Sequence, residues 1–211
     1  MRRMFLFVIL LISCGCEEIT NSTNSDSDRL EKIATLIDEG KSVEATPKLQ
    51  NYVKAYPRDD MALTILGHTY CDIGNYDEAR VVYQSALDLN PKQLRAYMGM
   101  GNAYRLEKEY NSAKVWYKRA IEVDATYAAP YSQLFVIAMY QHDDKIALDY
   151  AKKSYELDNV SKAVSAGNLA VAYHCNNDVE NRDKYTEIAV QLGYRRSALE
   201  AAFSGKAKLR D

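Results

Sequence analysis

The sequence predicts an all-α fold, a solenoid of about five helix pairs closed by a C-terminal capping helix. The first observation is a pattern that recurs with a period of 34 residues, most clearly across residues 60–127. The second is composition, since the 211 residues include only nine glycines and four prolines, and no alternation typical of strands follows residue 28. A fixed period of this length without strand signals is typical of stacked helical repeats.

Two consecutive copies of the pattern show it best. Small and large residues occupy fixed offsets in the first copy, and the same offsets recur 34 residues later. The first set is Leu66, Gly67, Tyr70, Ala79, Tyr83, Ala86 and Pro91, and the second is Met100, Gly101, Tyr104, Ala113, Tyr117, Ala120 and Ala125. These offsets resemble the tetratricopeptide repeat (TPR) family, and the resemblance implies a right-handed α-solenoid.

The pattern also has a physical interpretation. Leu66, Gly67 and Tyr70 are spaced to share one face of a first helix. Gly74 can adopt the left-handed conformation that ends this helix, and Pro91 stops the second helix. Small residues such as Gly67 allow two helix axes to approach to about 8 Å, and a tyrosine fills the space beside them.

The frame extends in both directions with weaker matches. In the first repeat Ile33 replaces the small residue of the first helix. In the fourth repeat Phe135 stands where glycine is expected, and we expect this large side chain to push the two helices apart. The expected repeats are 26–59, 60–93, 94–127, 128–161 and 163–196, followed by a capping helix and tail at 197–211.

The first residues of the chain have a different character. The apolar run 4–12 has the length of a secretory signal core, and it is too short to span a bilayer, which takes about 17 residues or more. Leu11 to Cys14 (LISC) resembles the lipobox of bacterial lipoproteins. That resemblance implies removal of residues 1–13 and acylation of Cys14, whose several acyl chains would anchor the protein at about 0.8 kcal/mol per buried methylene.

The lipobox also leads to an expected location. Gly15 stands where an aspartate would retain a lipoprotein in the inner membrane, so we expect the outer membrane of a bacterial envelope. Residues 14–28 are polar and rich in serine, asparagine and aspartate, as expected for a flexible tether. Two alternatives stay open, lipidation at Cys16 and a plain cleaved signal.

Charge argues against one class of partner. Without residues 1–13, the 27 lysines and arginines lose Arg2 and Arg3 and face 29 acidic residues, so the net charge is near −4. There is no basic excess to hold nucleic acid.

The sequence shows no constellation typical of catalysis, so we expect a non-enzymatic protein without a cofactor or metal. His68 and Cys71, with the neighbours His174 and Cys175, have the composition of a zinc site. The repeat frame separates the two pairs by three layers of about 10 Å each, too far for one site or for a disulfide between Cys71 and Cys175. A metal-binding or enzyme-associated envelope protein using either pair remains the alternative.

The TPR resemblance implies that a partner protein or peptide binds the concave face, formed by the first helix of each pair. The expected partner-binding residues are His68, Arg95, Met98, Asn102, Arg105, Gln133, Met139 and Tyr140. Methionine and tyrosine would give adaptable apolar contacts, and the two arginines favour an acidic ligand.

One TPR sub-family holds chaperone C-termini through a lysine and asparagine clamp. Asn102 matches that clamp, whereas Met98, Gln133, Val164 and Asn168 do not, so we do not expect a chaperone C-terminus as ligand. We expect a lipid-anchored scaffold or adaptor, similar in plan to the TPR lipoproteins that act as pilotins or in envelope assembly. Self-assembly through an exposed end repeat is a further hypothesis.

Overall fold

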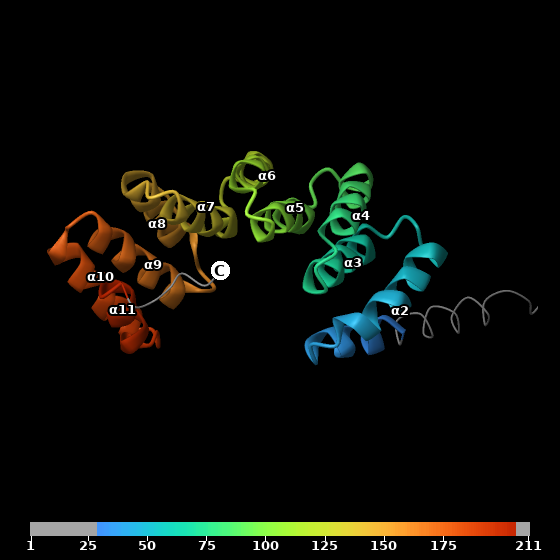
Figure 1. Ribbon diagram of the computed structural model, residues 1–211, viewed down its shortest axis with the longest axis horizontal. Helices are drawn as coiled ribbons and strands as arrows, with labels where there is room; N and C mark the ends of the chain where they lie inside the picture. The colour runs from blue at the N-terminus through green and yellow to red at the C-terminus, as the bar shows by residue number, and fades with distance from the viewer. Residues whose placement is uncertain (1–28, 206–211) are drawn as a thin grey trace, which may run out of the picture.

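The computed structural model describes residues 29–205, which form helices joined by short turns (Figure 1). Residues 29–38 are helical and pair with α2 (Ser42–Ala55). The later helices are α3 (Asp60–Asp72), α4 (Tyr76–Leu89), α5 (Leu94–Leu106), α6 (Tyr110–Val123), α7 (Ala128–Tyr140), α8 (Asp144–Leu157), α9 (Lys162–Cys175), α10 (Val179–Gln191) and α11 (Arg196–Phe203). The predicted all-α solenoid is confirmed. The expected signal, the lipid site Cys14 and the tether lie outside the described residues.

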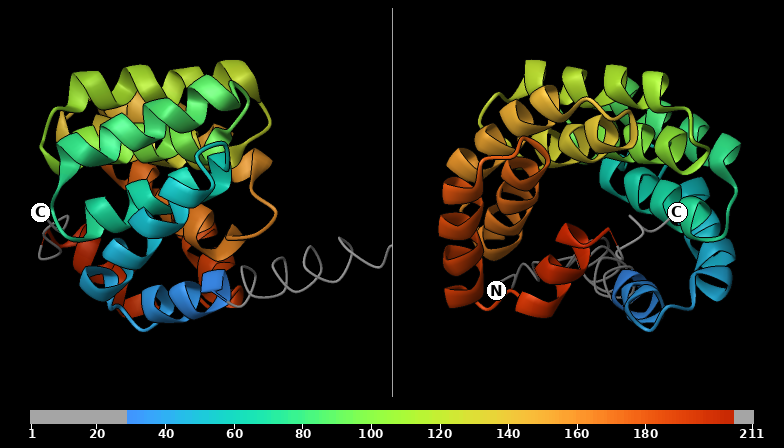
Figure 2. Two further views of the ribbon diagram at one scale, coloured as in Figure 1. Left: turned by 90° about the vertical axis from the view of Figure 1, so that its right-hand side faces the viewer. Right: turned by 60° about the vertical axis from the view of Figure 1, so that its left-hand side comes forward.

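The helix pairs stack side by side into a strongly curved solenoid (Figure 2). The two helices of a pair pack against each other, and the second helix also packs against the first helix of the following pair. Helices α3, α5, α7 and α9 lie on the inner side of the curve, and α4, α6, α8 and α10 lie on the outer side (Figure 2). We call the inner surface of α3, α5, α7 and α9 the concave face.

Helix α11 closes the C-terminal end of the stack. It packs against α9 and α10, with Leu199 buried and the Phe203 ring 4.8 Å from the ring of His174. It therefore occupies the place where a further repeat would begin, as expected for a capping helix.

The turn inside each pair contains one residue with a left-handed backbone. In the first two repeats this residue is Gly40 (φ 73°) or Gly74 (φ 82°). In the next three it is Lys108, His142 or Asn177, with φ between 55° and 64°. Residues with a Cβ adopt this conformation at a cost of about 1 kcal/mol or more, which glycine avoids. The turn geometry is thus kept although the glycine signal is lost from the sequence.

Aspartates begin several helices. The side chains of Asp59, Asp143 and Asp178 each accept a hydrogen bond from the backbone N–H three residues further on, at 2.9, 3.2 and 3.1 Å. Each bond satisfies a donor that the first helical turn leaves unpaired. The pairs Asp59–Asp60 and Asp143–Asp144 are therefore helix-start residues.

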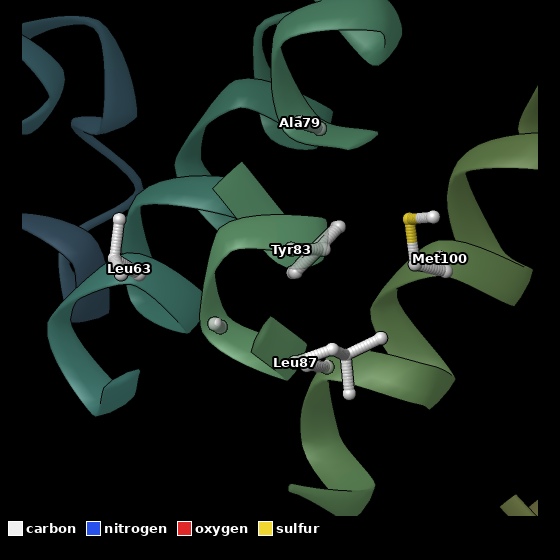
Figure 3. Close-up of a cluster of buried hydrophobic side chains, with 7 residues drawn as sticks. Leu63, Ala79, Tyr83, Leu87 and Met100 are labelled. Carbon is white, nitrogen blue, oxygen red and sulfur yellow. The ribbon is translucent and has the colours of Figure 1, made fainter. Parts of the chain in front are cut away.

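The core between α3, α4 and α5 is built around Tyr83, which is fully buried (Figure 3). A Cβ added at Gly67 of α3 would lie 2.4 Å from the Tyr83 ring, and one added at Gly99 of α5 would lie 2.3 Å from it. In the next pair a Cβ at Gly101 would lie 2.4 Å from the ring of Tyr117. The small residues of the repeat are therefore required by a tyrosine that crosses between the helices.

The fourth repeat corrects one expectation. Phe135 is buried, and α7 packs against α8 as closely as α3 packs against α4. The space that Phe135 needs is available because Ala151 stands where the preceding repeats have tyrosine, and both belong to one buried cluster. The prediction that Phe135 pushes the helices apart was wrong, since a small partner compensates for the large one.

Candidate partner-binding face

Helix α5 carries four of the eight predicted partner-binding residues. Arg95 is exposed, and Asn102 and Arg105 are half-buried. Met98 is only 9% exposed and packs in one cluster with Leu134 and Ile137 of α7. The structure therefore makes Met98 a core residue, and the other three remain available on α5.

Two of these residues meet the buried Tyr117 of α6. The Tyr117 hydroxyl donates a 2.7 Å hydrogen bond to Oδ1 of Asn102, and the Arg105 side chain lies beside the same hydroxyl. Burial raises the pKa of Tyr117 to about 12, and the positive charge of Arg105 opposes the rise. Tyr117 therefore remains a protonated hydrogen-bond donor at neutral pH.

Arg105 is incompletely paired. Its Nε atom is buried and has no hydrogen-bond partner among the described residues. Within residues 29–205 no carboxylate lies within ion-pairing distance of Arg95 or Arg105. The sequences of α5 and α7 contain no aspartate or glutamate at all. The centre of the concave face thus presents positive charge that the neighbouring helices do not neutralise.

His68 of α3 lies next to this region. Its ring meets the edge of the Tyr83 ring at 5.6 Å between centroids. The side chain keeps access to solvent, but the surrounding protein partly desolvates it and lowers its pKa. Asp72 opposes that change, and the positive charge of Arg95 adds to it. The charge of Arg95 on α5 therefore acts on His68 of the adjoining helix α3.

The remaining three predicted residues lie on α7, where two of them pack against other side chains. Gln133 is half-buried and stands 34 residues after Gly99. Met139 packs against the cluster between α7, α8 and α9. The Tyr140 ring stacks on Tyr110 of α6, with 5.4 Å between centroids and an angle of 12°. Met139 and Tyr140 therefore contribute to packing between helices.

Sequence reasoning assigned Tyr117 only to the core and missed its hydrogen bond to the concave face. The spacing offered a signal, because a polar residue follows Gly101 directly and lies on the helix that Tyr117 packs against. A tyrosine that crosses between two helices carries its hydroxyl to the far side of the core.

The histidine and cysteine pairs form no metal site among the described residues. No three His, Cys, Asp or Glu side chains of residues 29–205 gather where they could hold an ion, and Cys71 and Cys175 are free thiols. Burial raises the pKa of both thiols; for Cys71 the contact with Tyr83 opposes this, and for Cys175 the charge of Asp144 adds to it. A protonated thiol is a poor nucleophile and a poor metal ligand.

Two hollows lie away from the predicted residues. The larger, of about 840 Å³, lies between the helical residues 29–38 and α2, and both apolar residues such as Ile33 and Leu36 and charged residues such as Lys32 and Glu44 line it. The smaller, of about 390 Å³, contains Trp116, with the Arg119 guanidinium 4.3 Å from its ring. Within residues 29–205 no helix is long and apolar enough to cross a bilayer.

Comparison with known proteins supports the repeat assignment. Residues 67–105 match a model of the TPR repeat, and residues 94–127 match a second tetratricopeptide repeat model. No curated protein sequence matches the chain.

Several solved structures share the fold. Pseudomonas aeruginosa pilF has a TM-score of 0.72 at 16% identity, covering 85% of this chain and 82% of that one. A thermophilic TPR protein of Thermus thermophilus has a TM-score of 0.66 at 19% identity, with coverage of 86% and 98%. MamA of Desulfovibrio magneticus has a TM-score of 0.63 at 17% identity, with coverage of 79% and 94%. At these identities the similarity concerns the fold.

Proposed function

We propose that this chain, which contains TPR repeats, is a non-catalytic scaffold or adaptor that binds a partner protein or peptide on its concave face. TPR folds typically act as protein-interaction scaffolds. The observation that carries the proposal is the pair of arginines on α5, Arg95 and Arg105, which face no carboxylate among the described residues.

The charge of this face defines the partner's chemistry. The charge of Arg95 acts on His68, and Arg105 lies beside Tyr117 and Asn102, so cationic and hydrogen-bonding groups extend over α3 and α5. Arginine binds carboxylates through two parallel hydrogen bonds, which gives direction as well as attraction. The partner therefore carries acidic residues in the segment that lies along α5.

The test is capture of partners in cells by crosslinking, with the full-length chain beside an Arg95→Ala, Arg105→Ala double variant. We expect a protein that the unchanged chain retains and the double variant loses, while thermal melting of the variant remains cooperative. A Lys114→Ala, Lys118→Ala variant on the outer helix α6 removes the same charge and serves as the control. Identical sets of captured proteins from all three chains would contradict binding on the concave face.

We further propose that the protein is anchored by lipid at Cys14 to a bacterial cell envelope, at the outer membrane, in a pilotin-like or assembly role. The lipobox-like LISC sequence and the glycine after the cysteine support this location. Residues 14–28 would span at most about 50 Å when extended. Partner capture would then take place close to the membrane.

Lipidation has a direct test. A Cys14→Ala chain should incorporate no labelled fatty acid and should leave the membrane fraction, because its anchor is gone. Cys16→Ala is the matched control and should behave as the unchanged chain. Equal labelling of the Cys14→Ala chain would contradict the assignment.

A further inference from the structure

We infer that Arg105, Asn102 and Tyr117 form a carboxylate-binding subsite on the concave face, which takes an aspartate or glutamate side chain of the partner. The inference rests on the proposed function, since it specifies one contact of the same face. Arg105 and Asn102 would touch the carboxylate, and Tyr117 is a positioning residue behind them.

Arg105 supplies the charge and a directed donor. Its buried Nε–H has no acceptor among the described residues, and a buried donor without an acceptor costs free energy. A carboxylate can accept from Nε–H and from a terminal N–H of the same guanidinium together. This geometry selects a planar anion over a neutral amide.

Tyr117 fixes the orientation of Asn102. Because the Tyr117 hydroxyl donates to Oδ1, the amide oxygen of Asn102 points into the core. The Nδ2 group then remains as a donor, and it makes no hydrogen bond to another described residue. An orientation fixed before binding reduces the free energy that a ligand must spend on ordering the site.

The surroundings favour an anion. Neither α5 nor the facing α7 contains a carboxylate that could compete for Arg105. Gln133 of α7 stands where Gly99 stands in the preceding junction, and Gly99 is the residue that lets α5 lie directly on Tyr83. The inner helices α3 and α5 contact each other directly, and the direct contact between α5 and α7 is less extensive. The junction beside Tyr117 is therefore the more open of the two.

The preceding repeat provides an internal control. Tyr83 occupies the same repeat position as Tyr117, but among residues 29–205 the hydrogen-bond partner of its hydroxyl is the Cys71 sulfur, at 3.8 Å. His68 stands at the position of Asn102, so that repeat has no amide held by a tyrosine. Removing the Tyr83 hydroxyl should thus leave carboxylate binding unchanged.

The experiment is an NMR titration of the purified full-length chain, observing the Arg105 Nε–H and Asn102 side-chain amide resonances. The probes are acetyl-Glu-Glu-Glu-amide, acetyl-Gln-Gln-Gln-amide, and acetyl-Gln-Gln-Gln with a free C-terminal carboxylate. We expect the glutamate peptide to shift both resonances and the glutamine amide to shift neither. A shift caused only by the free C-terminus would overturn the assignment to acidic side chains.

The variants then test each role. Tyr117→Phe keeps the ring and should weaken glutamate binding about three- to tenfold, the usual effect of one hydrogen bond. Tyr83→Phe should have no effect. Asn102→Ala removes the same contact, leaves the Tyr117 ring in place and should weaken binding similarly. Arg105→Lys keeps the charge and should recover only part of the affinity that Arg105→Gln removes, since lysine cannot bind in two places at once.

Unchanged affinity in both Tyr117→Phe and Asn102→Ala would overturn the subsite. If partner capture in cells still required Arg95 and Arg105, the proposed function would stand and only the subsite would be wrong. If capture did not depend on the arginines but the glutamate peptide still bound through Asn102 and Tyr117, the subsite would exist without serving the proposed function.

Discussion

The repeats at 94–127 and 128–161 pack the same pair of helices with side chains of opposite size. In the first of them glycine on the inner helix, Gly101, meets tyrosine on the outer helix, Tyr117. In the second, phenylalanine on the inner helix, Phe135, shares a cluster with alanine on the outer helix, Ala151. Both arrangements fill the space between the helices, and both leave the helices closely packed.

The difference lies in what reaches the concave face. A tyrosine anchored on the outer helix spans the core and delivers its hydroxyl to Asn102 at 2.7 Å. Phe135 begins on the inner helix and has no polar end, so this side chain contributes packing and carries no hydrogen bond across the core; the hydrogen bond between α7 and α8 here joins Ser132 and Ser154, at 2.6 Å. Whether the large side chain comes from the outer or the inner helix therefore decides whether it also positions a polar group on the concave face or only fills the core.

The largest expected effect comes from converting one arrangement into the other. Tyr117→Ala should reduce the free energy of unfolding by about 3–5 kcal/mol, because a fully buried ring is lost and a cavity remains. Gly101→Phe alone should reduce it by about 1–3 kcal/mol or more through overpacking. The double variant should recover most of the loss, since phenylalanine then fills the cavity as Phe135 does beside Ala151. Denaturant unfolding of all four proteins gives the coupling between the two changes.

A distant pair provides the control for this cycle. Gly101→Phe combined with Leu199→Ala of α11 should show additive losses, because the two sites share no contacts. If the losses at Gly101 and Tyr117 were also simply additive, the two arrangements would not be interchangeable and the interpretation of the fourth repeat would fail.

A smaller effect is expected where Tyr83 contacts the following helix. Gly99→Ala should cost about 1–3 kcal/mol, because the new Cβ would lie 2.3 Å from the Tyr83 ring. Gly167→Ala is the matched control: its Cβ would meet Tyr194 at 3.4 Å, the edge of ordinary contact. That change should be neutral or stabilise by up to about 1 kcal/mol through helix propensity. Equal melting of the two variants would show that Tyr83 can move aside.

The smallest expected effect is a change of stability with pH. It arises in the second repeat, which has the titratable His68 where the third has Asn102. Desolvation lowers the pKa of His68 below its usual value of about 6.5, so the unfolded chain binds the proton more readily than the folded one. The contribution of neutral His68 is fully present above about pH 6.5 and is lost as the pH falls through the lowered pKa. Melting temperatures of the unchanged chain and His68→Gln, measured from pH 8 to pH 5, should diverge only in the acidic part. A constant difference would show that His68 does not titrate differently on folding.

The repeat frame predicted the helix pairs and the residues that touch within a pair, because these contacts are close in sequence. How far Met98 and Tyr140 are exposed to solvent could not be predicted from the repeat frame. Met98 is covered by α7, and Tyr140 stacks on Tyr110 of α6, so both depend on how one pair packs against the next. The effect of Phe135 likewise depends on Ala151, because a large side chain overpacks a core only when the residue that it meets is large as well.

The predictions for the first 28 residues remain predictions. The signal, acylation of Cys14 and the tether rest on the resemblance of LISC to a lipobox and on composition. The all-helical character of residues 29–205 was predictable, because amphipathic spacing is a local property that tertiary packing does not need to create.

The sequence by itself determined the all-α class, the 34-residue period and the need for small residues at Gly67 and Gly101, since each can be recognised from helical spacing. Only the tertiary structure decided that Tyr117 crosses the core to hold Asn102, and that Arg105 lies beside it with a buried and unpaired Nε–H. The physical reason is that hydrogen bonding and charge pairing depend on separations of a few ångströms between different helices. A repeat pattern specifies which residues face one another, and packing decides whether their polar atoms meet.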